Sequence, residues 1–262
     1  MNVVHVIIIS CSIIFISTVL GSGLVFIVKK NLSDKTSNII LGLASGVMIA
    51  AGIFGLLIPA MEEAEFIYKN LSFIPVFGGF ILGGIFLNIL DKIIPHFHNK
   101  QGEEEGPKSN LAKQIKFFLA VLIHNIPEGL AVGFACGLAL TLKSPEAISS
   151  VLALAIGISI QNIPEGAAIS IPMLEHGVSK KKSFLYGVIS GTAEPIFAIV
   201  GLFLATIMQT LLPWLLAFSA GAMIYVTIEE LLPEARKGGH EHYGLWAFML
   251  GFLAMLALEM LL

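Results

Sequence analysis

Eight stretches of the sequence are apolar and long enough to cross a lipid bilayer as helices, and this feature limits the fold more than any other. A spanning helix needs about 20 apolar residues, whereas a transmembrane β-strand has about 10 and alternates between apolar and polar residues. These stretches are longer and do not alternate. The expected helical spans are approximately 3–28, 37–60, 73–90, 117–142, 147–172, 184–208, 211–233 and 243–262. We therefore predict an all-α polytopic membrane protein, with one transmembrane domain over residues 1–262.

The composition supports this class and excludes others. Apolar residues make up 56% of the chain and charged residues 13%, whereas charged residues make up about 25% of a soluble domain. The net charge of −3 provides no basic excess for phosphates, so no nucleic-acid partner is expected. Cys11 and Cys136 each lie inside an apolar stretch, which indicates small packing residues and not a disulfide framework.

Lysine and arginine are concentrated in one set of loops. Cytoplasmic loops carry such an excess, and all basic residues except Lys69 and Lys143 lie in loops 29–36, 91–116, 173–183 and 234–242. This bias predicts that these four loops are cytoplasmic and that both termini lie outside, in a multi-pass protein of the plasma or inner membrane. Residues 91–116 are polar and are expected to form a flexible cytoplasmic loop.

One pentapeptide, Asn-Ile-Pro-Glu-Gly, occurs in both the fourth and the fifth predicted span, which run antiparallel. His124 lies four residues before Glu128, and Gln161 lies four residues before Glu165, so each pair shares one helix face. The proline of each motif removes a backbone hydrogen bond and is expected to kink its helix. Carbonyl groups freed in this way are tolerated in a bilayer only when buried or when lining a cavity.

The charge of these two motifs indicates a metal site. Glu128 and Glu165 would be carboxylates at membrane depth, at a cost of about 3 kcal/mol each, and neither predicted span contains Lys or Arg. A divalent cation would cancel the two charges, and carboxylates with a neutral imidazole suit zinc and neighbouring first-row metals. We predict one site shared by both helices, at which the carboxylates can bridge two ions. The alternative interpretation is that the His and Glu residues are protonated packing residues and that each Pro-Gly pair only kinks its helix. This alternative explains a single motif better than it explains two matched motifs.

Further acidic and histidine residues are candidates for the same pathway. Glu194 precedes Pro195 in the sixth span and is predicted to reach the same cavity, the alternative being a carboxyl paired with a nearby Thr or backbone group. An inner relay toward the cytoplasm is the hypothesis for Glu229, Glu230, His96, His98, His176, His240 and His242, with interfacial charges and plain polar loops as the alternative. Glu259, near the outer end of the last span, is expected to be solvated.

The second and seventh spans also resemble each other, at 45–49 and 220–224. They run in opposite directions in the predicted topology. This favours an inverted repeat, an arrangement in which transporters place their site near the middle of the membrane.

At these residues the chain resembles the ZIP family of divalent-metal transporters, in particular its bacterial zinc-uptake and GufA-like branches. The resemblance covers nearly the whole chain: the eight spans, the outer termini, the loop after the third span and the paired motifs. Residues 124–129 match the fourth-helix motif in full, and Glu194-Pro195 matches the Glu-Pro of the sixth helix. Gln161 departs from the family, because the fifth-helix motif often begins with His.

The resemblance implies a 3+2+3 inverted-repeat bundle that moves Zn²⁺ into the cytoplasm, with broader acceptance of Cd, Fe or Mn. It implies a binuclear core site for up to two ions, which are substrates and not catalytic cofactors. The first ion would be held by His124, Glu128, Gln161 and Glu165, and the second by Asn125, Glu128, Asn162, Glu165 and Glu194. Met48 would add a thioether. The family also implies a homodimer and an elevator-type motion of helices one, four, five and six against two, three, seven and eight.

An enzyme is not expected. An intramembrane metalloprotease needs a His pair such as His-Glu-x-x-His and an open coordination position, but the predicted spans hold one His in the membrane core and no such motif. A cation channel, a metal sensor and a proton-coupled carrier of organic ions remain as alternatives. A channel would pass current without a saturating rate.

Overall fold

The computed structural model describes residues 3–27, 33–94, 96–97, 104–105, 113–175 and 177–262, most of which are helical. In chain order the elements are α1 (Val3–Gly23), η1 (Leu24–Phe26), α2 (Asp34–Ala50), η2 (Ala51–Leu57), α3 (Ile58–Tyr68), η3 (Lys69–Leu71), α4 (Phe73–Ile93), β1 (His96–Phe97), β2 (Glu104–Glu105), α5 (Lys113–Leu142), α6 (Pro145–Glu175), α7 (Lys180–Gly191), α8 (Ala193–Ile207), η4 (Gln209–Leu211), α9 (Leu212–Val226), η5 (Thr227–Leu231), α10 (Leu232–Glu234) and α11 (Glu241–Leu261). The segments η2 and η5 are π-helical, and the other η elements are 3-10 turns.

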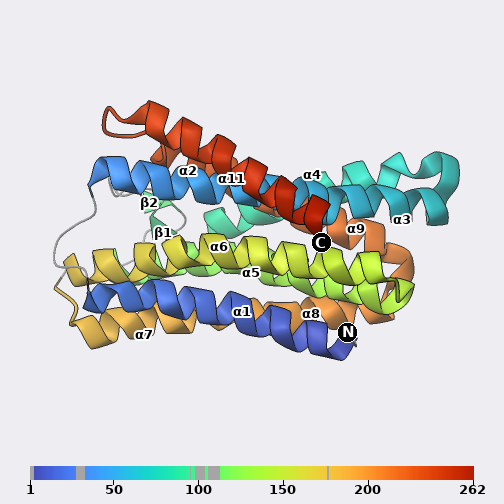
Figure 1. Cartoon of the computed structure of the whole chain (residues 1–262), viewed down its shortest axis with the longest axis horizontal. Coiled ribbons are helices and arrows are strands. Elements are labelled where there is room, and N and C mark those ends of the chain that lie inside the picture. Colours follow the sequence, from blue (N-terminus) through green and yellow to red (C-terminus); the bar gives the residue numbers. More distant parts are fainter. Residues whose placement is uncertain (1–2, 28–32, 95, 98–103, 106–112, 176) are drawn as a thin grey trace.

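Among the described residues, eight helices are long and apolar enough to cross a membrane, which confirms the predicted class. We number them as spans: span 1 is α1 with η1, span 2 is α2–η2–α3, span 3 is α4, span 4 is α5, span 5 is α6, span 6 is α7–α8, span 7 is α9–η5–α10 and span 8 is α11. The spans lie roughly along the long axis of the molecule (Figure 1).

The two ends of this bundle differ in charge. We call the end at which α2, α7 and α11 begin the basic end, because Lys35, Lys237 and the Lys180–Lys182 run lie there. The opposite end contains the α3–α4 and α5–α6 connections. Helix α1 begins, and α11 ends, toward this opposite end (Figure 1), as an even number of spans requires.

The segment between the second and third spans differs from the prediction. The expected second span ends at residue 60 and the third begins at 73, but α3 and η3 extend the helix of span 2 as far as Leu71. Pro59 lies at the start of α3 but inside the continuous helix of span 2, directly after the π-helical η2, and its missing N–H removes one backbone hydrogen bond there. Ala60 and Ala64 are buried, so this extension has a packed face.

The predicted loop at 91–116 is shorter than expected. Helix α4 continues to Ile93 and α5 begins at Lys113. Between them, β1 and β2 form a two-stranded antiparallel ladder in which His96 is opposite Glu105. The flexibility of this loop remains a prediction.

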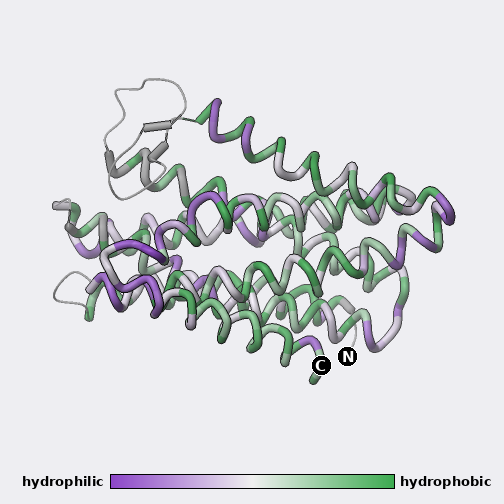
Figure 2. The backbone as a smooth tube through the Cα atoms, turned by 90° about the horizontal axis from the view of Figure 1, so that it is seen from above, coloured by the Kyte–Doolittle hydropathy of each residue, from purple (hydrophilic) through white to green (hydrophobic). Residues whose placement is uncertain are grey.

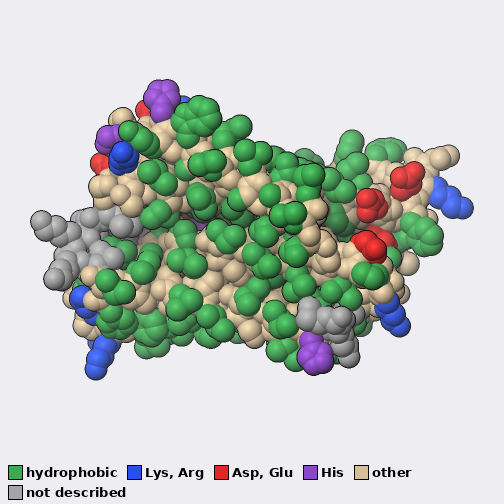
Figure 3. Space-filling view, viewed as in Figure 1, with side chains coloured by type: hydrophobic (Ala, Val, Ile, Leu, Met, Phe, Trp, Pro, Cys, Tyr) green, Lys and Arg blue, Asp and Glu red, His purple; other side chains and the backbone are tan. Residues whose placement is uncertain are grey.

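The outer surface of the bundle is apolar around its middle. Hydrophilic residues are concentrated toward the two ends of the tube in Figure 2, and the space-filling view in Figure 3 shows hydrophobic side chains over the central part. Exposed residues on several spans include Phe77, Ile81, Ile199, Phe203 and Leu250. Such a band is suited to lipid, so the chain is a multi-pass membrane protein.

Four pairs of spans pack most closely: span 1 with span 5, span 2 with span 8, span 3 with span 7, and span 4 with span 6. An inverted repeat that relates spans 1–3 to spans 6–8, and span 4 to span 5, exchanges these pairs with one another. The pair of spans 1 and 5 becomes that of 6 and 4, and the pair of 2 and 8 becomes that of 7 and 3.

The repeat can be followed residue by residue in the pair of spans 2 and 8 and in its equivalent, the pair of spans 7 and 3. A Cβ atom on Gly46 would collide with the carbonyl of Phe248, and one on Gly251 with the carbonyl of Leu43, so span 2 touches span 8 through backbone.

Spans 7 and 3 repeat this contact. Gly221 lies against the carbonyl of Phe80, and Gly83 against that of Phe218. The spacing of each glycine from its partner's carbonyl residue is conserved, because Gly221 follows Phe218 by three positions as Gly46 follows Leu43. Small residues permit such close helix approach in a membrane. These contacts confirm the 3+2+3 inverted-repeat bundle.

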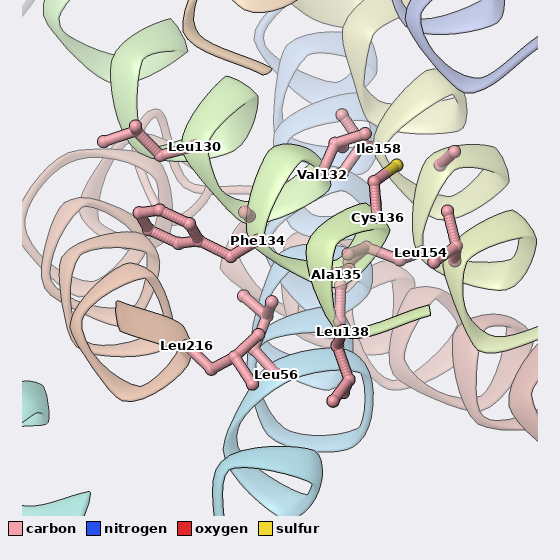
Figure 4. Close-up of a cluster of buried hydrophobic side chains, with 14 of the residues drawn as sticks. Leu56, Leu130, Val132, Phe134, Ala135, Cys136, Leu138, Leu154, Ile158 and Leu216 are labelled. Carbon is pink, nitrogen blue, oxygen red and sulfur yellow. The ribbon is translucent and has the colours of Figure 1, made fainter. Parts of the chain in front are cut away.

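An apolar cluster occupies the half of the bundle that is farther from the basic end. Figure 4 shows Leu130, Phe134 and Leu138 of α5 beside Leu154 and Ile158 of α6, with Leu56 and Leu216 from spans 2 and 7. These side chains are buried, and the α5 members follow Glu128 while the α6 members precede Gln161. The paired motifs therefore lie on the basic-end side of this apolar cluster.

Candidate metal site

Spans 4 and 5 place the paired motifs in the centre of the bundle. Both helices continue through their prolines, Pro127 and Pro164. The motif glycines set the positions of the neighbouring spans, because a Cβ on Gly129 would meet the carbonyl of Glu194 and one on Gly166 the carbonyl of Thr18. The repeat thus brings spans 6 and 1 equally close to the two motifs.

Glu128 and the amides of span 5 form one hydrogen-bonded group. The Nε2 of Gln161 donates to Glu128 Oε2 at 2.7 Å and to Asn162 Oδ1 at 2.6 Å. All three side chains are buried. The predicted convergence of the fourth and fifth spans is therefore present.

Glu194 of α8 reaches the same group from span 6. Its Oε2 accepts from Nδ2 of Asn162, and its Oε1 accepts from Thr18 Oγ1 at 2.9 Å. Thr18 and Glu194 occupy equivalent positions of the two repeats, as the motif-glycine contacts establish. The hydrogen bond between them therefore lies near the symmetry axis. The alternative interpretation of Glu194, a carboxyl group paired with a Thr, is thus correct about the Thr. This pair nevertheless lies beside the other predicted site residues.

Glu165 and Asn125 complete the cluster with unsatisfied oxygens. Glu165 Oε1 and Asn125 Oδ1 are buried and have no hydrogen-bond partner among the described residues. The Nδ2 of Asn125 donates to the backbone oxygen of Ser190 at 3.1 Å and to its hydroxyl at 3.2 Å. Buried acceptors without partners are uncommon and are suited to a cation.

His124 contacts span 7. Its Nε2 lies 2.8 Å from Glu230 Oε1, and both side chains are largely buried. Glu230 belongs to the π-helical segment η5, and π-helical turns occur frequently at functional sites. His124 is also close enough to Glu165 and Asp91 for their charges to interact.

The carboxylates of the cluster have no basic partner among the described residues. Glu128 is close enough to Glu165 and Glu194 for their charges to repel. In the part of the chain that the structure describes, no Lys or Arg forms an ion pair with any of these three residues. A bound cation would therefore reduce the repulsion between these carboxylates.

The amide side chains are required to complete a site. Within the described ranges, no three His, Cys, Asp or Glu side chains gather closely enough to hold a metal ion by themselves. Gln161 and Asn162 direct their N–H groups at carboxylates, so a cation bound there requires these amides to turn their oxygens inward.

Met48 lies in span 2. It is buried beside Leu87, Ala222 and Val226, and Thr227 Oγ1 lies 3.8 Å from its sulfur. Its role as a ligand remains a prediction.

The residues of the proposed inner relay are placed differently from one another. Glu230 is at the site, while Glu229 lies near Tyr225, whose hydroxyl accepts from Asn88 Nδ2 at 3.0 Å. His240 and His242 are exposed at the basic end. His98 and His176 lie outside the described residues, and only the backbone of His96 is described.

Sequence reasoning missed several residues of this region. Thr18, Ser190 and Asp91 gave no motif, although Asp91 is an acid only 9% exposed in α4. Glu259, which was expected to be solvated, is only partly exposed: its Oε1 is buried, and its carboxyl group is close to Ser150 of span 5. Its position near the outer end of the last span predicted exposure to solvent, but α11 packs against span 5.

Comparison with known proteins identifies the family. Residues 98–259 match the ZIP Zinc transporter family. The zinc transporter GufA of Myxococcus xanthus is 34% identical over 93% of this chain and 94% of its own length. The zinc transporter ZupT of Streptococcus mutans is 34% identical over 92% and 91%, and the human zinc transporter ZIP11 is 31% identical over 92% and 93%. The chain therefore belongs to the ZIP family of metal-ion transporters.

Proposed function

We propose that this protein takes up divalent cations, with Zn²⁺ as the principal substrate, across the cell membrane into the cytoplasm. The observation that carries the proposal is the central cluster of Glu128, Glu165 and Glu194, which lack basic partners among the described residues. Charges at membrane depth cost about 3 kcal/mol each unless compensated. A divalent cation compensates two of them.

The site holds up to two ions. His124, Glu128, Gln161 and Glu165 bind the first, which is supported by the Gln161–Glu128 hydrogen bond and by the free oxygen of Glu165. Asn125, Asn162 and Glu194 bind the second together with the shared Glu128 and Glu165. Support for this set comes from the Asn162–Glu194 contact and the unpartnered oxygen of Asn125.

The basic end faces the cytoplasm, as the lysine distribution predicts. Ions leave the site through His124 and Glu230, which are in contact. Glu229, His240 and His242 continue this relay, together with the predicted contributions of His96, His98 and His176. Polar groups on this side and the apolar cluster of Figure 4 on the other favour an inward-facing conformation.

Transport proceeds by sliding of spans 1, 4, 5 and 6 against spans 2, 3, 7 and 8. The placement of close backbone contacts supports this division. Glycines that meet a neighbouring span's carbonyl do so within one group, as Gly166 does with Thr18 and Gly46 with Phe248. Between the groups, Gly55 and Gly157 meet side chains. Side-chain interfaces can slide, whereas interlocked backbones move together.

The metal range and assembly follow the family resemblance. Carboxylates, amides and one imidazole accept Cd, Fe and Mn as well as Zn, because such sites select by geometry and supply as much as by affinity. We also propose a homodimer.

The test is uptake into proteoliposomes, with each metal offered alone and then in competition. The wild type should take up Zn²⁺ at a rate that saturates with concentration. The uptake rate of Glu128→Gln should be at least about tenfold lower. Glu62→Gln, at an exposed position on α3, is the matched control and should keep it. Absence of metal uptake by the folded wild type, or normal uptake by Glu128→Gln, would reject the proposal. A rate proportional to concentration without saturation would indicate a channel.

A further inference from the structure

Glu259 is a carboxylate inside the outer half of the bundle that the proposed pathway does not use. It lies on α11, at the interface of span 8 with spans 2 and 5. Its Oε1 is buried and has no hydrogen-bond partner in the described part of the chain. This oxygen lies over Gly55, since a Cβ there would be 3.4 Å from it and 3.5 Å from the Cβ of Leu154.

The inverted repeat pairs Glu259 with Asp91. Glu259 follows Gly251 by eight positions, and Asp91 follows Gly83 by eight positions. Gly251 and Gly83 make the equivalent backbone contacts described above. Each acid is also the nineteenth residue of a 21-residue helix, α11 or α4. The two carboxylates thus hold matching places, one in each half of the bundle.

Asp91 lies beside the proposed exit path. It is 9% exposed, and its carboxylate is close enough to the His124 imidazole and the Tyr225 phenol to influence both electrostatically. Glu230, which contacts His124, follows Gly221 by nine positions, as Gly55 follows Gly46. The repeat therefore places Gly55 where the inner half has Glu230. The space that a side chain would fill at Gly55 is bordered by the carboxylate of Glu259.

We propose that Glu259 is the cation-binding residue of the outer access path, and that it passes the incoming divalent cation to the central site. The inference rests on the proposed function. In an alternating-access protein built from inverted repeats, the two halves exchange conformations when the site changes sides. The path that opens on the outside is then the symmetry mate of the present inner path, and Glu259 lines it as Asp91 lines the inner one.

The repeat also explains the unpartnered oxygen. A carboxylate that stays buried against Gly55 and Leu154 in one conformation gains an aqueous cation partner in the other. A carboxylate with a purely structural role would be expected to have its oxygens satisfied by the protein.

The experiment compares zinc transport from the two faces of the membrane. Uptake into cells measures the KM at the outer face, and inverted membrane vesicles measure the KM at the inner face. Glu259→Gln should raise the outer KM about three- to tenfold, through loss of one charge attraction, with the inner KM unchanged. Asp91→Asn, the symmetry-matched variant, should raise the inner KM and leave the outer one unchanged. Glu62→Gln should change neither.

Each result decides a different question. An unchanged outer KM in Glu259→Gln, or a lower maximal rate and melting temperature with no change in KM, overturns the inference. If Glu259→Gln does not fold, Glu259→Asp replaces it. The outer KM of Glu259→Asp should be higher than that of the wild type, but by less than the increase expected for Glu259→Gln. Failure of the wild type to transport any divalent cation rejects the proposed function itself.

Discussion

Gln161 has a central place among the residues of the site. Its amide nitrogen donates both to Glu128 and to Asn162 and so links the motifs of spans 4 and 5. His124 occupies the equivalent place in the other motif and contacts Glu230 in span 7. At these two equivalent positions the proposed site would thus offer a cation one imidazole and one amide. An amide oxygen is a harder and weaker ligand than imidazole, so this asymmetry bears on metal preference.

Replacing either residue with the other type should change the preference between zinc and manganese. Gln161→His gives the site a second nitrogen ligand and should raise the ratio of zinc to manganese uptake about tenfold, or ~1.4 kcal/mol of discrimination. His124→Gln should lower the same ratio. The measurement is the initial rate for each metal in proteoliposomes containing wild type or either variant. A constant ratio across the three proteins would show that Gln161 does not touch the transported ion.

The site could be predicted from sequence to the extent that its residues belong to a repeated pattern. Glu128, Gln161, Asn162 and Glu194 were expected together, and their hydrogen bonds join them. Helical spacing predicts which residues share a face but not which span that face meets. For this reason Thr18, which binds Glu194 from span 1, was missed.

The elements are held by backbone contacts at glycine. Spans 3 and 7 show this most directly, because α4 contains two adjacent glycines with different surroundings. A Cβ on Gly83 would collide with the carbonyl of Phe218, whereas one on Gly84 would lie 3.6 Å from Tyr225, an ordinary contact.

These two glycines should respond oppositely to the same small change. Gly83→Ala forces spans 3 and 7 apart and should cost about 1–3 kcal/mol of stability. Gly84→Ala adds helix propensity without a clash and should be neutral or stabilising, by up to about 1 kcal/mol. Thermal melting of the purified protein in detergent compares them. If Gly83→Ala melts with the wild type, the close approach of these spans does not stabilise the bundle.

The spans were more predictable than their partners. Hydropathy fixes where a helix crosses a membrane, because about 20 apolar residues are needed whatever the neighbours. It gives no information on which spans touch, so the pairing of span 2 with span 8 required coordinates. It also underestimated span 2, since α3 continues beyond the apolar stretch on buried Ala60 and Ala64.

The whole molecule has a charge asymmetry that predicts its orientation. Asn70 and Ser179 are exposed residues near opposite ends of the bundle, Asn70 in η3 and Ser179 directly before α7. With the basic end in the cytoplasm, Asn70→Cys should react with a membrane-impermeant maleimide in intact cells. Ser179→Cys should react only after permeabilisation. The wild type measures the background from Cys11 and Cys136, and the reverse labelling pattern would invert the proposed direction of transport.

Spans 2 and 5, which belong to different groups in the proposed sliding motion, meet through side chains of the apolar cluster. Leu154 of span 5 is fully buried there, and the ideal Cβ of Gly55 in span 2 lies 3.5 Å from the Leu154 Cβ. This separation suits a disulfide, for which Cβ atoms are about 3.5–4.5 Å apart. Because these residues belong to different groups of the proposed motion, a covalent bond between them would prevent the two groups from sliding past each other.

The double variant Gly55→Cys, Leu154→Cys should therefore stop transport when oxidised. Zinc uptake by reconstituted protein should fall about tenfold or more after treatment with an oxidant and return with dithiothreitol. Each single variant, oxidised in the same way, is the control for the substitutions and for Cys11 and Cys136. Mass spectrometry of the intact protein establishes that the bond has formed. The bond prevents the sliding that an elevator requires, whereas cations moving through a static path would be unaffected. Undiminished uptake by the fully cross-linked protein would therefore reject the relative motion of spans 2 and 5.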